Sequence, residues 1–98
     1  MSPQRFFEFG NDIDKLTQRI DERVEALKSA GEFSDSHSKT ELELRARERK
    51  LRERVDDAIR SGSTWDMVRA ELHRDYSSLF DNLVRFEEGI DAQYDERA

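Results

Sequence analysis

Two histidines, His37 and His73, are the side chains of this chain that would titrate near neutral pH or bind a transition metal. Neither belongs to an HxxxH, HExxH or ExxH pattern, which would place metal ligands on one face of a helix. Glu71, His73 and Asp75 alternate with a period of two, so a helix would point them in different directions. The spacing predicts no metal site. His73 is expected to pack its ring at the edge of a helix or to act in a pH-sensitive interface.

Carboxylates are abundant, with 23 Asp and Glu residues, but their arrangement does not indicate catalysis. Acid–base or hydrolytic chemistry needs a pocket that shifts the pKa of a carboxylate, or a serine activated by a base. No such grouping is visible in the sequence, and the four glycines are too isolated to form a phosphate-binding loop. We therefore expect a protein that is not an enzyme and uses no cofactor.

A basic run, RARERKLRER at positions 45–54, raises the question of nucleic-acid binding because six of its ten residues are Arg or Lys. The run also contains two Glu and no aromatic residue for base stacking, and the whole chain has a net charge of -6. A solvated helix face is the favoured interpretation. The sequence predicts no direct binding of nucleic acid.

The composition indicates elongated helices in a single small domain. Of the 98 residues, 35% are hydrophobic and 41% are charged, and there are only one Pro and four Gly to interrupt regular structure. No run of apolar residues is long enough for a signal peptide or a membrane span. Because Cys is also absent, we expect a protein of the reducing cytoplasm.

Apolar residues recur at spacings of three and four, which predicts three amphipathic helices over residues 6–30, 38–60 and 64–90. Residues 1–5 are expected to form an arm. Residues 91–98 are expected to form a polar tail that either extends the third helix or frays. Short connections favour an antiparallel up-down-up arrangement, so the predicted fold class is an all-α, three-helix antiparallel coiled-coil bundle.

The middle helix carries the weakest apolar stripe. Ser38 and Glu41 match a capping box, so we expect this helix to begin near Ser38. Between Leu44 and Leu51 the core-facing heptad position is occupied by Arg47 or Glu48, and between Leu51 and Ala58 it is occupied by Arg54. This predicts a polar layer inside the bundle. The middle helix is also the basic one, and antiparallel packing would place its arginines beside acidic neighbours.

The up-down-up arrangement predicts an apolar cluster at each end of the bundle. One cluster would contain Phe6, Phe9, Ile59, Trp65 and Val68, and the other would contain Leu27, Phe33, Leu42, Phe86 and Ile90. Phe7, Met67 and Val84 fall outside the main stripes and are the candidate apolar contacts for a partner. The thin core favours self-association as well.

These features predict a non-enzymatic protein–protein interaction or adaptor protein that presents a helical face, binds a protein partner and forms a homo-oligomer, most simply a dimer. The alternative is an acidic inhibitor or nucleic-acid mimic that occupies a basic groove through Glu71, Asp81 and Glu88. A third class, lipid association through an opened bundle, is less favoured because the acidic faces lack a Lys/Arg girdle.

The segment from 42 to 83 resembles a group of small bacterial coiled-coil proteins. In that group a charged, leucine-spaced helix leads through a Ser-rich break into a Trp-bearing amphipathic helix, and some members are linked to stress responses. The positions that match this pattern here are Ser63, Thr64, Trp65, Val68 and Leu72. The resemblance implies a helical fold and no catalytic residue.

Overall fold

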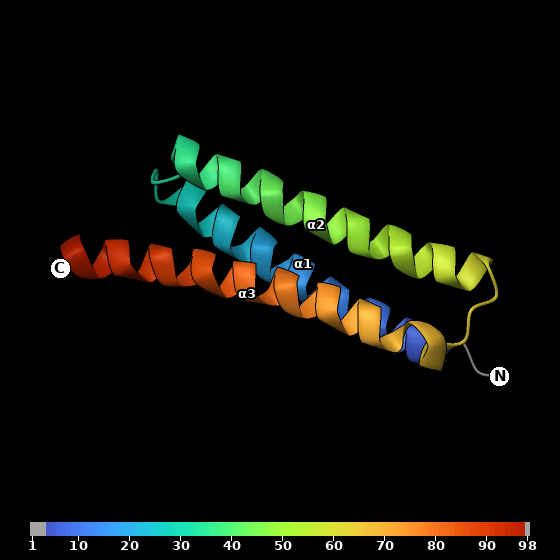
Figure 1. Ribbon diagram of the computed structural model, residues 1–98. Helices are drawn as coiled ribbons and strands as arrows, with labels where there is room; N and C mark the ends of the chain where they lie inside the picture. The colour runs from blue at the N-terminus through green and yellow to red at the C-terminus, as the bar shows by residue number, and fades with distance from the viewer. Residues whose placement is uncertain (1–3, 98) are drawn as a thin grey trace.

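Three long α-helices make up the protein. The computed structural model describes residues 4–97, with side chains described through residue 92. The helices are α1 (Gln4–Ser29), α2 (Asp35–Arg60) and α3 (Trp65–Arg97). The middle helix runs antiparallel to the other two, and the bundle measures 53 × 18 × 17 Å (Figure 1). The predicted three-helix, up-down-up bundle is confirmed.

The helix boundaries differ from the predicted ones at both ends of the chain. Helix α1 already begins at Gln4, within the predicted arm, and α3 continues to Arg97 through most of the predicted polar tail. Figure 1 shows this last part of α3 running past the turn between α1 and α2. Residues 1–3 of the predicted arm and residue 98 of the predicted tail lie outside the described residues.

The start of α2 lies three residues before the predicted one. Ser34 is the N-cap, and its hydroxyl accepts a hydrogen bond from the His37 backbone N–H at 3.2 Å. In return, the Ser34 backbone N–H donates to Nδ1 of His37 at 3.2 Å, which completes a reciprocal capping box. The predicted cap at Ser38 is therefore wrong. The sequence pattern expects Glu or Gln at the third helical position, whereas an imidazole nitrogen fills that role here.

Both connections leave their helix through a glycine with positive φ. Gly31 has φ +69° and Gly62 has φ +74°. The Glu32 N–H then donates to the Leu27 carbonyl at 2.9 Å, and the Ser63 N–H donates to the Ala58 carbonyl at 2.9 Å. These are the bonds of a Schellman motif, which satisfies the last carbonyls of a helix and reverses the chain in a few residues. The tight reversals place consecutive helices side by side in antiparallel order.

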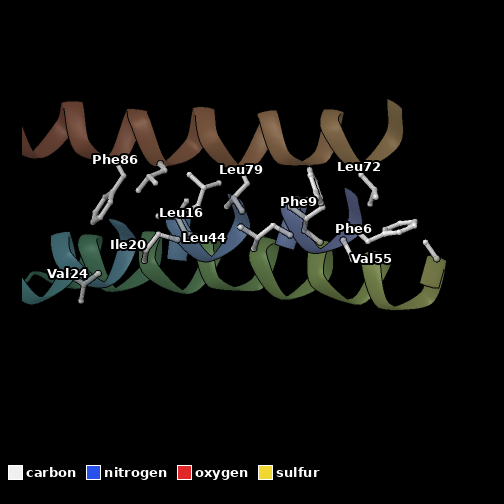
Figure 2. Close-up of a cluster of buried hydrophobic side chains, with 14 of the residues drawn as sticks. Phe6, Phe9, Leu16, Ile20, Val24, Leu44, Val55, Leu72, Leu79 and Phe86 are labelled. Atoms are coloured by element: carbon white, nitrogen blue, oxygen red, sulfur yellow. The ribbon is translucent and has the colours of Figure 1, made fainter. Parts of the chain in front are cut away.

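One continuous apolar core runs along the bundle (Figure 2). Helix α1 contributes seven buried apolar side chains at alternating spacings of three and four, whereas α2 contributes only four. The thin stripe of α2 predicted from the sequence is thereby confirmed. The side chains with the least exposure are Ile13, Ile20, Leu27, Leu44, Leu51, Leu79 and Leu83.

The two predicted end clusters form, but each without one member. At the N-terminal end of α1, the Trp65 ring lies 5.5 Å from the rings of Phe6 and Phe9, while Ile59 is 48% exposed. At the opposite end Leu42 is 68% exposed. Both side chains belong to α2, whose core-facing stripe is narrow. Leu42 is two residues from the buried Leu44, and a helix turns it about 160° away from the core.

Of the positions predicted to form a polar layer, Glu48 is half-buried and pairs with Arg52. Leu44, Leu51 and Val55 give α2 an apolar face, with Arg47 and Arg54 exposed at its edge. The bundle is slender, so long side chains at the edge of the stripe reach past the core to the neighbouring helix or to solvent. Among the described side chains, the charged residue with the deepest burial is Glu87 on α3.

Candidate interaction surfaces

The contact between α1 and α3 is closed by an ion-paired carboxylate. Glu87 is 8% exposed and accepts hydrogen bonds from Arg19 and Arg23, the latter at 2.9 Å. Burial by itself would raise the pKa of Glu87, but the hydrogen bonds and charges of the two arginines outweigh it and hold that pKa below the ordinary value. Glu87 is therefore ionised at neutral pH and fixes α3 against α1.

Two sets of ion pairs with the same arrangement join α1 and α2. Arg45 pairs with Asp21 on α1 at 2.8 Å and with Glu41 on its own helix at 2.9 Å. One heptad later along α2, Arg52 pairs with Asp14 at 2.8 Å and with Glu48 at 2.9 Å. Each arginine is held from two sides. The prediction that the basic helix would lie beside acidic neighbours is confirmed for this seam.

The next layer of the same seam is apolar. Phe7 lies one heptad before Asp14 on α1, and Ile59 lies one heptad after Arg52 on α2. Because α1 and α2 are antiparallel and Asp14 pairs with Arg52, Phe7 and Ile59 lie at the same end of the seam. Phe7 is 66% exposed and Ile59 is 48% exposed. We call these two side chains the Phe7–Ile59 patch. It lies outside the core, at the end of the bundle where α1 begins and α2 ends.

An ion pair and a side-chain hydrogen bond cross the contact between α2 and α3. Arg54 pairs with Asp75 at 2.5 Å, and Arg47 donates to the Ser78 hydroxyl at 3.2 Å rather than to a carboxylate. Hollows of about 330, 190 and 390 Å³ lie along this seam. Adjacent hollows share Arg47 or Arg54 as a lining residue, and these two side chains reach across the seam to Ser78 and Asp75.

An aromatic cluster covers the N-terminal ends of α1 and α3. The His73 ring lies 5.6 Å from the Phe9 ring and 5.7 Å from the Trp65 ring. The predicted packing of His73 at the edge of the helix is thus confirmed, and a role in a pH-sensitive interface stays a prediction. A hollow of about 830 Å³ beside these rings is lined by both acidic and basic side chains, among them Asp12 and Arg69.

His37 has a structural role that the sequence did not reveal. Its ring is buried between Phe33 and Phe86, with ring centroids 6.2 and 6.0 Å away, and its Nδ1 lies 3.1 Å from the Glu32 carbonyl oxygen. The spacing of Ser34 and His37, three residues apart, would have indicated this role if the capping-box pattern included histidine as well as Glu and Gln. The ring joins the cap of α2 to the apolar end cluster.

The apolar site residues predicted from the sequence do not come together on one surface. Phe7 belongs to the patch on the α1–α2 seam, and Met67, which is 74% exposed, lies on α3. Val84 is half-buried rather than exposed. Its position on the helix turns it toward α1, as is also the case for Phe80, which lies under the Arg19 guanidinium at 5.5 Å. Val84 is therefore a weaker contact candidate than the other two.

The acidic candidates fall on two different rows of α3. Asp81 and Glu88 are exposed and seven residues apart, so they share the outer face of the helix. Glu71 is ten residues before Asp81, which turns it roughly 80° away, toward α2. Glu71 also lies 4.0 Å from Arg74. All three predicted carboxylates are exposed, and they lie on two rows of α3.

Among the side chains that the structure describes, residues 4–92, no group of three or more His, Asp or Glu is placed to hold a metal ion. No described helix is long and apolar enough to cross a membrane. Comparisons with protein-family models, curated proteins and solved structures found no match to this chain. The resemblance to small bacterial coiled-coil proteins stays a prediction.

Proposed function

We propose that this chain is a non-enzymatic interaction protein, an adaptor that self-associates through the Phe7–Ile59 patch. The observation that carries the proposal is the change of chemistry along the α1–α2 seam. Two layers of the seam are closed by arginine–carboxylate pairs, and the next layer ends in two exposed apolar side chains. Burying large apolar residues of one exposed end against a second surface is favourable, because it removes them from water.

The charges beside the patch favour a second copy of the chain as its occupant. On this seam the α1 side is acidic, with Asp14 and Asp21, and the α2 side is basic, with Arg45 and Arg52. A twofold axis parallel to the bundle would set the α1 side of one copy on the α2 side of the other. Opposite charges would then meet, and the two patches would merge into one apolar cluster.

Light scattering of the purified protein tests this proposal. We expect a mass of about twice 11.6 kDa at micromolar concentration. Phe7→Ser should weaken the dimer by about tenfold or more, because the apolar contact is lost from both sides of the twofold axis. Leu42→Ser is the matched control, since Leu42 is equally exposed but lies on the outer face of α2. A wild-type protein that stays monomeric at high concentration would contradict the proposal.

One observation favours the second candidate function, an acidic inhibitor or nucleic-acid mimic. Among the described side chains, Asp81 and Glu88 have no ion-pair partner and form an outward row on α3. A basic probe such as a poly-lysine peptide should then bind with a steep salt dependence. The double substitution of Asp81 and Glu88 to Asn should abolish this binding. If the double variant binds the probe as the wild type does, the row is an ordinary solvated face.

A further inference from the structure

We propose that Gly10 is a contact point between two copies of the chain, a notch on α1 into which Ile59 of the second copy packs. This inference rests on the proposed self-association and deepens it, because it names the residues that set how closely the two copies approach. Three features of the molecule support it, namely the chemistry of the layer that contains Gly10, the space beside this residue and its place next to the Phe7–Ile59 patch.

Gly10 belongs to the layer of the α1–α2 seam that follows the last ion pair. In the preceding layer the Arg52 guanidinium donates to the Thr17 hydroxyl at 2.9 Å and pairs with Asp14 and Glu48. The next layer lies one heptad earlier on α1 and one heptad later on α2, since the two helices are antiparallel. Its four corresponding residues are Gly10, Phe7, Val55 and Ile59. Every polar side chain of the seam is therefore replaced in this layer.

Within a single copy Gly10 has no role that alanine could not fill. It lies six residues inside α1, its φ is not positive, and a Cβ added to it would meet no atom within 4 Å. Glycine inside a helix is less favourable than alanine, because glycine loses more backbone entropy on folding. A close approach by a second molecule explains a glycine here, since glycine alone leaves the backbone uncovered.

The missing side chain leaves a notch beside the Phe7–Ile59 patch. Gly10 is half-buried and lies three residues from Phe7, and residues three apart are neighbours on a helix surface. Phe7 and Ile59 are 66% and 48% exposed, so both stand out from the seam next to the notch. A surface that carries both a notch and projecting apolar side chains can pack against a second copy of itself.

The twofold axis parallel to the bundle selects Ile59 as the side chain that enters the notch. This axis sets α1 of one copy against α2 of the other at the same height. Phe7 and Ile59 share a layer, and Gly10 is less than one helical turn from Phe7, so Ile59 of the second copy comes opposite Gly10. A methyl group at position 10 would take the place of that side chain and hold the two copies apart.

Dimer dissociation constants of the full chain, measured by analytical ultracentrifugation, test this inference. Gly10→Ala should weaken the dimer by about fivefold or more, and Gly10→Leu should weaken it further. Gly89→Ala is the matched control, because Gly89 also lies inside a helix with room for a Cβ but lines a hollow between α2 and α3. Its dissociation constant should stay within about twofold of the wild-type value.

Melts followed by circular dichroism exclude unfolding as the cause of a weaker dimer. At a concentration where the protein is monomeric, Gly10→Ala and Gly89→Ala should both raise Tm, because alanine favours the helix. Gly10→Ala should therefore stabilise the single copy while weakening the dimer. A merely structural role of Gly10 would not separate these two effects.

A double-mutant cycle identifies the side chain opposite the notch. Ile59→Ala alone should weaken the dimer by about fivefold or more. In the Ile59→Ala background, Gly10→Ala should weaken it by less than about twofold, because the smaller side chain leaves room for the added methyl group.

Three results would overturn the inference and leave self-association intact, provided that Phe7→Ser weakens the dimer. They are a Gly10→Ala dimer as tight as that of the wild type, an equally large effect of Gly89→Ala, or equal effects of Gly10→Ala with and without Ile59→Ala. A wild-type protein that stays monomeric would instead contradict the proposed function, and this inference with it. The two failures are therefore distinguishable.

Discussion

Glu87 shows how one buried charge is held in a bundle of this size. Its carboxylate lies among apolar neighbours on α3 but is bound by Arg19 and Arg23, whose guanidinium groups remain partly exposed. Burying a charge costs free energy unless it is paired and hydrogen-bonded, and here each carboxylate oxygen has an arginine donor. Because both donors come from α1, the pair fixes how α1 and α3 lie against each other.

Replacing Glu87 with Gln should lower the free energy of unfolding by about 1–2 kcal/mol at pH 7, because two charge-assisted hydrogen bonds are weakened. The pKa of Glu87 is lowered in the folded state, so its stabilising effect is complete above the ordinary value of 4.5 and is lost as the pH falls through the lowered pKa. Urea unfolding from pH 7 to pH 3 measures this. The wild type and Glu87→Gln should converge as the pH falls below 4.5, and a constant difference would contradict the ion-pair account.

The cap of α2 gives a second residue-scale prediction. Ser34→Ala should lower the free energy of unfolding by about 1 kcal/mol, since the His37 backbone N–H loses its acceptor. Ser38→Ala serves as the control at the cap position suggested by the sequence pattern, and it should change stability by less than about 0.5 kcal/mol. Thermal melts of the two variants distinguish the two positions. Equal destabilisation would mean that the helix begins later than Ser34.

At the scale of the elements, two helices contain a glycine at a position where a side chain would fit. A Cβ added to Gly10 in α1 would meet no atom within 4 Å, and the same holds for Gly89 in α3. Neither position has a positive φ, in contrast to Gly31 and Gly62. The helix-ending glycines are therefore conformationally required, whereas within one copy of the chain those inside the helices only increase the entropy lost on folding.

Gly10→Ala should raise the free energy of unfolding by about 0.5–1 kcal/mol, because alanine loses less backbone entropy than glycine in a helix. Gly31→Ala should lower it by about 1–2 kcal/mol, because alanine is strained at positive φ. Differential scanning calorimetry of both variants measures the two shifts in Tm, which should have opposite signs. A stabilising Gly31→Ala would argue against the Schellman ending of α1.

For the whole molecule, the three seams are closed by different means. Two arginines bind one buried carboxylate between α1 and α3, arginines bridge two carboxylates each between α1 and α2, and one ion pair and a hydrogen bond cross between α2 and α3. The apolar core beneath them is common to all three helices, so the bundle should unfold as one cooperative unit. Trp65 packs on Phe6 and Phe9 at one end of the bundle, so its fluorescence can be used to follow the unfolding of the whole bundle.

Leu83→Ala should lower the free energy of unfolding by about 3–5 kcal/mol, because Leu83 is fully buried and its truncation leaves a cavity in a slender core. Denaturation followed by Trp65 fluorescence and by circular dichroism should give coincident transitions in the wild type, although Leu83 and Trp65 are five turns apart along α3. Transitions that separate would show that the two ends of the bundle unfold independently.

The sequence by itself determined the fold class, because spacings of three and four fix which side of a helix is apolar. It also determined the order of the helices and the glycine at which α1 ends, and it identified Phe7 and Met67 as exposed apolar residues. These features depend on residues close together in the chain. Local periodicity and turn chemistry are therefore sufficient to predict them.

Only the tertiary structure decided which charges are buried and which surfaces stay open. Glu87 looks like any other acidic residue until α1 brings Arg19 and Arg23 beside it, across more than 60 positions of sequence. Ile59 is exposed although its neighbour Ala58 is buried, because the core-facing stripe of α2 is narrow. Such features depend on register and distance between helices, which the period of a single helix does not specify.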